Sequence, residues 1–343
     1  SNTPKSIAPR SIAVSKDGTI FFDNENQIWK QTPSGELSVV AGNPSIWSAQ
    51  DGIGSEANFG AISAMSVGPD GAVYLCDENA IRKVEANGRV TTIAGELGWD
   101  SIGGYTNGSV AEARFNDPNG IAVAADGTIF VSEQHNGCIR RISKNGTVDT
   151  YVGYGPLGAL GGWFYMDAQG SNARCQPAHL AIDNEGNLYF EDAGTIRKVN
   201  KDRVVRTIGG YWGGESELRE GVSEGARIPS YGNGIAVDRR GTVYVAYDNF
   251  ILTAESIVNP VSGDPFPEAT QLPEDTAKPE VQTPEQPTPP SPAQTPSGGG
   301  GAAPAVEKSK KGSKKSGGSS KKSSAKKSGG SSKKSSAKKS GGS

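Results

Sequence analysis

Histidine and cysteine, the side chains that most often hold zinc, are scarce in this chain of 343 residues. It has two His, His135 and His179, and three Cys, Cys76, Cys138 and Cys175. A zinc site of three His cannot be built from two, and no C-x-x-C pair is present. Cys76 is expected to be a buried thiol at the end of a strand. A Cys138–Cys175 disulfide is an alternative that the sequence leaves open.

Long apolar runs and recognisable catalytic motifs are missing as well. No stretch has enough consecutive apolar residues to cross a bilayer, so no transmembrane segment is expected. No G-x-S-x-G, P-loop or paired metal-ligand motif occurs, and no segment shows helical periodicity. These absences favour an all-β protein that is not an enzyme.

One short phrase occurs five times along the chain. Each copy is an apolar run, a turn pair that ends in Gly, and a second apolar run. The copies are SIAVSKDGTIFF from Ser11, AMSVGPDGAVYL from Ala64, GIAVAADGTIFV from Gly120, HLAIDNEGNLYF from His179 and GIAVDRRGTVYV from Gly234. The turn pairs recur at steps of 53, 56, 59 and 55 residues. A period of this size indicates a repeat architecture.

Each repeat predicts four short antiparallel strands. The first two form a tight hairpin, because Gly supplies the positive φ that its turn needs. In four repeats a third strand begins at Ile28, Ile81, Ile139 and Ile196, and a fourth ends at Gly42, Gly95, Gly153 and Gly209. Four antiparallel strands per repeat are the unit of a β-propeller blade.

The string from Ala111 to Gly153 resembles an NHL repeat. It reads A-x-A-R-F-x-x-P-x-G-I-A-V, then D-G-x-[IV]-[FY]-V, then I-R-[KR]-[IV], then a last strand that ends in Gly. The resemblance covers about residues 7 to 257 and implies a propeller that usually closes with six blades. Here Ile251-Leu252-Thr253 replaces Ile-Arg-Lys, and no clear fourth strand precedes Pro260. We therefore expect residues 1–257 to form about five blades of an incomplete six-bladed ring.

Four long segments join the blades, at 43–61, 96–119, 154–179 and 210–233. The blade topology predicts that they lie on one face of the ring. Loops on a rigid scaffold often bind ligands, and Trp and Tyr often anchor interfaces. The candidate binding residues of this face are Trp47, Trp99, Tyr105, Trp163, Tyr165 and Trp212. Packing is the alternative role, because these segments also cover blade edges.

Two columns of charged residues recur with the blade period. Carboxylates follow the second strands at Asp77, Glu133 and Asp192. They could hold Ca²⁺ or another divalent cation at the channel mouth, as the resemblance to gluconolactonase-like propellers implies, or they could bond the adjacent backbone. No other cofactor is expected. The third strands carry a column that we expect to form structural ion pairs: Arg82, Arg140 and Arg197.

Charge divides the chain into an acidic body and a basic tail. Residues 308–343 hold 13 Lys and no acidic residue, which leaves 22 basic against 37 acidic side chains in residues 1–307. Residues 258–306, rich in Pro, Thr and Glu, predict an extended linker. Residues 307–343 contain SGGSSKKSSAKK twice and predict a disordered tail. Its composition is similar to silaffin-type and linker-histone-type tails, which implies a polyanionic partner: an anionic polysaccharide, a mineral or a nucleic acid.

Together these features predict a secreted, non-enzymatic binding module whose propeller face binds a protein, peptide or glycan. The acidic propeller disfavours RNA. Two alternatives remain open: a metal-dependent hydrolase or lyase in the propeller mouth, and a structural component of a larger assembly. Because the chain begins at Ser1 rather than Met, we expect processing or truncation, and an intracellular location is the alternative to secretion. In a secreted protein, Asn107 and Asn145 are candidate glycosylation sites.

Overall fold

The computed structural model describes residues 8–98, 103–156, 165–210, 221, 225–226, 228–229, 232–247 and 250–254. Within these residues the protein is all-β, with strands β1 to β21 and two single 3₁₀ turns. No helix in this part of the chain is long and apolar enough to cross a membrane. The chain divides into two units, Ser1–Glu268 and Ala269–Ser343. The predicted linker at 258–306 and the tail at 307–343 lie outside the described residues.

Five antiparallel sheets follow one another along the chain, and each corresponds to one sequence repeat. Blade 1 contains β1 (Ile12–Val14), β2 (Ile20–Asn24), β3 (Gln27–Gln31) and β4 (Leu37–Gly42). Blade 2 contains β6 (Ile62–Val67), β7 (Val73–Asp77), β8 (Asn79–Val84) and β9 (Arg89–Glu96), with β5 (Gly52–Ile53) at its edge. Blade 3 contains β11 (Gly120–Val123), β12 (Ile129–Glu133), β13 (Cys138–Ile142) and β14 (Thr147–Gly153), with β10 (Gly108–Ser109) at its edge.

The last two blades differ in how complete they are. Blade 4 contains β15 (Leu180–Ile182), β16 (Leu188–Asp192), β17 (Thr195–Val199) and β18 (Val205–Gly210). Blade 5 contains β19 (Gly234–Val237), β20 (Val243–Tyr247) and β21 (Phe250–Ala254), so its described part has three strands. The β-propeller predicted from the repeats is confirmed. The fourth blade ends one residue later than the sequence predicted, at Gly210 rather than Gly209.

A glycine lies at or next to the end of the fourth strand in each of the first four blades, where the second-to-third turn lies directly over it. These four glycines, Gly42, Gly95, Gly153 and Gly210, all have positive φ. A Cβ on Gly95 would lie 2.4 Å from the Asn79 carbonyl oxygen, and one on Gly153 would lie 2.4 Å from the Gly137 oxygen. Both the backbone conformation and the lack of space therefore require Gly here.

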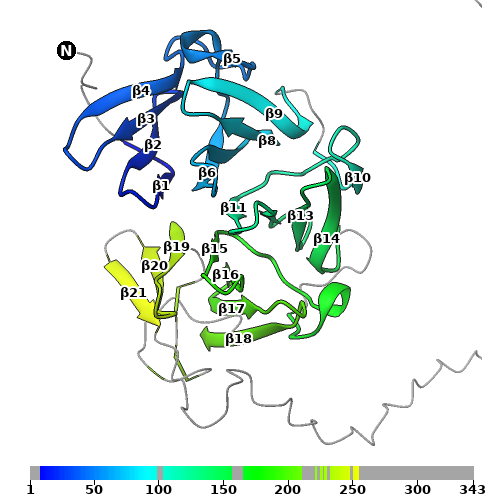
Figure 1. The fold of residues 1–343 in the computed structure, drawn as a ribbon. Helices are drawn as coiled ribbons and strands as arrows, with labels where there is room; N and C mark the ends of the chain where they lie inside the picture. The colour runs from blue at the N-terminus through cyan, green and yellow to red at the C-terminus, as the bar shows by residue number, and fades with distance from the viewer. Residues whose placement is uncertain are drawn as a thin grey trace, which may run out of the picture. The chain divides into compact units, whose positions relative to one another are not determined.

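The hydrophobic core lies between neighbouring blades. Ala13 and Phe21 of blade 1 pack with Met65 and Leu75 of blade 2, and equivalent clusters join the later blades. Each blade thus has a forward face, which packs on the next blade, and a backward face, which packs on the preceding one. Figure 1 shows the innermost strands around a common centre, and they contact one another in the order β1, β6, β11, β15, β19.

The sequence analysis predicted that the connections between blades lie on one face of the ring. In the structure they also run along the outer edges of the blades. The first runs along the outer edge of blade 2, where β5 pairs with the start of β9. The second does the same on blade 3, where β10 pairs with the start of β14. On blade 4 an isolated bridge joins Gln169 to Val204. Each of these three connections therefore covers the exposed edge of the blade that follows it, and free edges are a liability in sheets.

Candidate functional site

A buried ion pair joins the two charged columns in each of blades 2, 3 and 4. The Nη1 atom of Arg82 lies 2.6 Å from Asp77 Oδ2, and that of Arg140 lies 2.8 Å from Glu133 Oε2. In blade 4 the corresponding distance, from Arg197 to Asp192, is 2.6 Å. Each pair lies within one blade, since the carboxylate ends the second strand and the Arg is on the third. The predicted ion pairs are confirmed.

The same Arg side chains hold the preceding connection against the blade. Arg140 Nη1 also donates to the Arg114 carbonyl at 3.1 Å, and Nη2 donates to the Thr106 carbonyl at 2.7 Å. Nη2 further donates to Asn107 Oδ1 at 2.7 Å. Arg82 and Arg197 repeat this pattern, with Asp51 and Asp167 in the place of Asn107. The charged side chain therefore fixes where each connection crosses the blade edge.

Two of the six candidate binding aromatics belong to this arrangement. The guanidinium of Arg140 lies 4.9 Å from the centre of the Tyr105 ring, and that of Arg197 lies 4.4 Å from the Tyr165 ring. Tyr105 also bonds Thr150 through its hydroxyl, at 2.5 Å. Such cation–π contacts stabilise a desolvated Arg. For these two rings the structure shows the packing role that the sequence analysis gave as the alternative.

The other four aromatics have different outcomes. Trp47, between β4 and β5, is 65% exposed. Trp99, Trp163 and Trp212 lie outside the described residues. Apart from Trp47, the exposed large apolar side chains of the connections include Ile46, Ile53, Tyr154 and Met166, which sequence reasoning did not single out.

The carboxylates considered for metal binding have their oxygens engaged. Asp77 accepts the Gly60 N–H at 3.0 Å, and Glu133 accepts the Asn116 N–H at 2.7 Å, in addition to their Arg partners. Burial raises the pKa of Asp77, Glu133 and Asp192, and the neighbouring Arg acts against it. The described residues contain no cluster of three or more His, Cys, Asp or Glu side chains that could hold a metal. A divalent site on these carboxylates stays a prediction.

Glu191 and His179 form a polar pair that the sequence analysis did not identify. Glu191 Oε1 accepts the Gly232 N–H at 2.6 Å, which joins blade 4 to the entry of blade 5. Its buried Oε2 has no hydrogen-bond partner and lies 4.0 Å from His179 Nδ1, too far for a hydrogen bond. Burial raises the pKa of Glu191 to about 7 and lowers that of His179.

Glu191 directly precedes Asp192, and the residues at this repeat position form another column. Ser132, one residue before Glu133, donates to the Ala178 carbonyl at the entry of blade 4. Cys76, one residue before Asp77, points its thiol at the Gly120 carbonyl, 3.9 Å away, at the entry of blade 3. The residue before each carboxylate therefore contacts the next blade. Aligning the repeats at this position would have singled out Glu191 as the one carboxylate of the three.

The remaining sequence candidates have local roles. Cys76, Cys138 and Cys175 are buried and free. Asn107 is used by Arg140 and also donates to Thr150 Oγ1 at 3.2 Å. Asn145 accepts the Thr147 N–H at 3.2 Å within an exposed turn. Glycosylation of either Asn stays a prediction.

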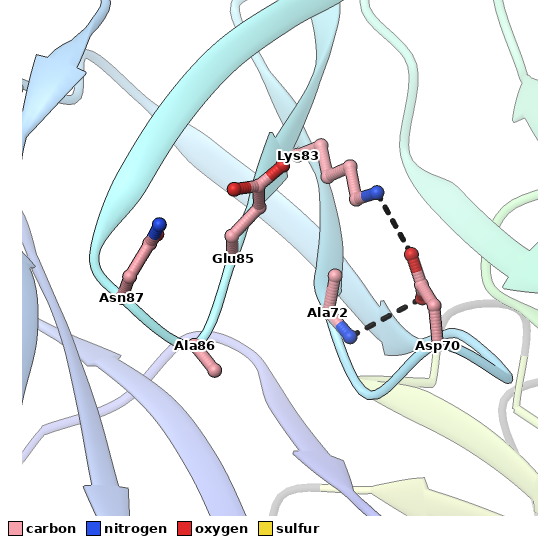
Figure 2. A pocket seen from close by; sticks show the side chains of 6 residues that line it. All are labelled: Asp70, Ala72, Lys83, Glu85, Ala86 and Asn87. Carbon is pink, nitrogen blue, oxygen red and sulfur yellow. Dashed lines mark hydrogen bonds and ion pairs between the residues drawn. The ribbon is translucent and has the colours of Figure 1, made fainter.

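A shallow hollow lies on blade 2, away from the starts of the connections. Figure 2 shows it between the β6–β7 and β8–β9 turns. Its volume is about 340 Å³. Its lining residues are Asp70, Ala72, Lys83, Glu85, Ala86 and Asn87. Lys83 Nζ and Asp70 Oδ2 pair at 2.8 Å, so the charges of these two residues compensate each other. The β8–β9 turn beside the hollow also accepts the Gly54 N–H of the first connection at Gly88, at 2.9 Å.

Comparisons with known proteins find similarities of low sequence identity, and they assign no function. No family model matches the sequence. The chain is 25% identical to Teneurin-4 of Homo sapiens over 265 residues, which cover 71% of this chain and 9% of that protein. It is 24% identical to Teneurin-3 of Danio rerio over 216 residues, which cover 56% of this chain and 8% of that protein. The chain thus spans less than a tenth of the length of these relatives.

The solved structures that are similar share only a low sequence identity with the chain. One is a structural genomics protein of unknown function from Bacteroides thetaiotaomicron, with a TM-score of 0.49, 17% identity, and coverage of 69% of this chain and 56% of that chain. Another is the gluconolactonase XC5397 of Xanthomonas campestris, with a TM-score of 0.45, 14% identity, and coverage of 72% of this chain and 72% of that chain. These values assign no activity to the protein.

Proposed function

We propose that the protein is a secreted, non-enzymatic binding module. Its blade-to-blade connections bind a protein, peptide or glycan, and its Lys-rich tail attaches the propeller to a polyanionic surface. The observation that carries the proposal is the position of the exposed large apolar side chains. Within the described residues they occur on the connections and on the two end blades, whereas blades 2, 3 and 4 keep theirs covered.

The connections suit this role because their paths are fixed while their surfaces are open. Arg82, Arg140 and Arg197 hold the first three connections at the blade edges through several hydrogen bonds. Trp47 and Tyr154 remain exposed beside these fixed points. A pre-ordered surface loses little conformational entropy on binding, and Trp and Tyr frequently contribute most to such interfaces.

The tail supplies the second contact of the proposal. Residues 308–343 hold 13 Lys and no acidic residue, whereas residues 1–307 are strongly acidic. Multivalent attraction to a polyanion follows from this charge and is weakened by salt. The Pro-rich segment at 258–306 separates the two contacts as an extended spacer.

The binding face is tested with a glycan array and a displayed peptide library as probes. We expect bound glycans or peptides to lose affinity when Trp47 and Tyr154 are both changed to Ala. The control variant is Lys16→Ala, at an exposed position in the β1–β2 turn of blade 1. Equal binding by the double variant and the native chain would contradict the proposed face.

The tail is tested by adsorption to immobilised heparin at low and high salt. A chain that ends at Pro260 should lose the salt-sensitive adsorption of the full chain and keep any glycan or peptide binding. If the shortened chain adsorbs as strongly as the full chain, the tail is not the attachment element.

A further inference from the structure

The two end blades each leave one sheet face without a neighbour from the described part of the chain. On the backward face of blade 1, Ile12 and Val14 are each 61% exposed. On the forward face of blade 5, Ile251 is 67% exposed. In Figure 1 these are the first and the last sheets of the ring. Aliphatic side chains of this size are rarely left exposed together without a binding role.

The same repeat positions are buried wherever a neighbouring blade is present. Ile251 corresponds to four third-strand residues that are 0–1% exposed: Ile28, Ile81, Ile139 and Ile196. Ile12 corresponds to Met65, Ile121 and Leu180, which are all buried. Ile12 and Ile251 therefore lie on two unpaired blade faces, which we call half-joints. Their exposed apolar positions match positions that are buried between blades inside the molecule.

The two half-joints are complementary in residue type. Inside the molecule, the forward face presents Ala and an aromatic ring, as Ala181 and Tyr189 do, to the aliphatic backward face of the next blade. Blade 5 repeats this pair on its forward face with Ala236 and Tyr244, which lie opposite each other in β19 and β20. Blade 1 supplies the matching backward face with Ile12, Val14 and the Phe22 ring.

Trp29 indicates that the neighbour of blade 1 is not held in the way the internal blades are. It occupies the position of Arg82, Arg140 and Arg197, which hold a preceding connection through its carbonyl groups. An indole has one donor where the guanidinium has five, and the Trp29 N–H has no hydrogen-bond partner. The backward face of blade 1 is thus fitted to an apolar surface rather than to a connection like the internal ones.

We propose that the forward face of blade 5 in one copy of this chain binds the backward face of blade 1 in a second copy. The interface is heterologous, because two different surfaces meet, and each added copy exposes the same two faces again. Association is therefore open-ended and depends on concentration. This inference goes beyond the proposed function, since it concerns the end blades and not the connections.

Two variants of the full chain separate the faces. Ile12→Lys with Val14→Lys blocks the backward face of blade 1, and Ile251→Lys blocks the forward face of blade 5. All three side chains are largely exposed, so the fold should be retained, which far-UV circular dichroism checks. Ile53→Lys, at an exposed position on a connection, is the control. Sedimentation velocity from about 1 to about 100 µM measures association, and high salt screens the electrostatic attraction of the Lys-rich tail.

We expect the native chain and the control to grow in mass with concentration. Each blocked variant alone should weaken association at least about tenfold, because it lacks one of the two faces. An equimolar mixture of the two blocked variants should form pairs and stop there, since each contributes its one intact face.

Several results would overturn the proposal. A native chain that stays monomeric throughout would show that the faces are covered within one copy or by another partner. A blocked variant that still associates, or a mixture that forms no pairs, would show that association uses a different surface. Loss of association in the control would indicate nonspecific contact.

Discussion

Arg140 and Glu133 form an ion pair that is closed to solvent, with Nη1 and Oε2 2.8 Å apart and both side chains fully buried. Arg141, the next residue, pairs with Asp149 at 2.6 Å, but both of those side chains are more than a third exposed. The two pairs share one strand and similar geometry, and they differ in burial. They are therefore a matched set for measuring what the buried pair contributes.

Replacing Glu133 by Gln leaves the Arg140 charge buried without its counter-ion. We expect the free energy of unfolding to fall by about 3–5 kcal/mol, as when one partner of a buried pair is removed. Asp149→Asn should cost at most about 1 kcal/mol, because its pair is screened by water. Urea unfolding followed by circular dichroism measures both. Equal losses for the two variants would mean that burial does not set the strength of the pair.

The pH dependence of stability should depend on Glu191. Its pKa is about 7 in the folded chain against 4.5 as a model value, so the folded state keeps a proton that the unfolded state releases. Its contribution is complete below pH 4.5 and is lost as the pH rises to about 7, at about 1.4 kcal/mol per pH unit. Glu191→Gln should remove this decline, which denaturant unfolding at a series of pH values detects.

His179 acts in the opposite direction at the same joint. Burial lowers its pKa, so its contribution is present above the model value of 6.5 and is lost as the pH falls through the folded pKa. His179→Gln should therefore remove a loss of stability on the acid side and leave the decline caused by Glu191. A variant that removed both slopes at once would show that the two groups titrate as one unit.

Substitution should lower the free energy of unfolding more at the glycines near the ends of the fourth strands than at those of the hairpin turns. Gly95 and Gly71 both have positive φ, but only at Gly95 would a Cβ meet backbone atoms, 2.4 Å from the Asn79 oxygen. Gly71→Ala should cost about 1 kcal/mol for the backbone conformation alone. Gly95→Ala should cost clearly more, and thermal unfolding of the two variants compares them. Similar midpoints would indicate that the Asn79 turn moves aside.

Divalent cations should have little effect on the propeller. Asp77, Glu133 and Asp192 lie in three separate blades, and each already has an Arg partner. We expect the unfolding midpoint to change by less than about 1 °C when calcium or EDTA is added. A stoichiometric metal in the purified protein, or a clear stabilisation by calcium, would instead support the metal site that the carboxylate column suggested.

The sequence predicted the blades well because their signals are local. The turn pair Asp126-Gly127, for example, lies in a hairpin in which Gly127 has a φ of +88°, and its position follows from the repeat alone. The recurrence of Arg140 and Glu133 likewise indicated an ion pair. These features depend on residues close together in the chain, so a periodic sequence reveals them.

The role of the connections could not be read in the same way. Tyr105 looked like a binding residue because it lies on a long, irregular segment, yet it packs on Arg140 from 35 positions further along the chain. Glu191 drew no attention because its unusual environment comes from burial beside Gly232 and Tyr247, which it meets only in the folded ring. Long-range packing decides both cases. For Glu191 the sequence gives a sign of it only when the repeats are aligned with one another.

Each of these connections is held where it crosses the blade edge. Its length can therefore change without a change in the stability of the fold. Each stretch runs from the glycine near the end of one blade to the Asp or Asn that the next Arg holds. The stretches are Gly42–Asp51, Gly95–Asn107 and Gly153–Asp167, with separations of 9, 12 and 14 positions. Both ends of each stretch are held in place, so insertions between them should leave the blades unchanged. The propeller is therefore a suitable carrier for grafted peptides, displayed at several sites at once from a single chain.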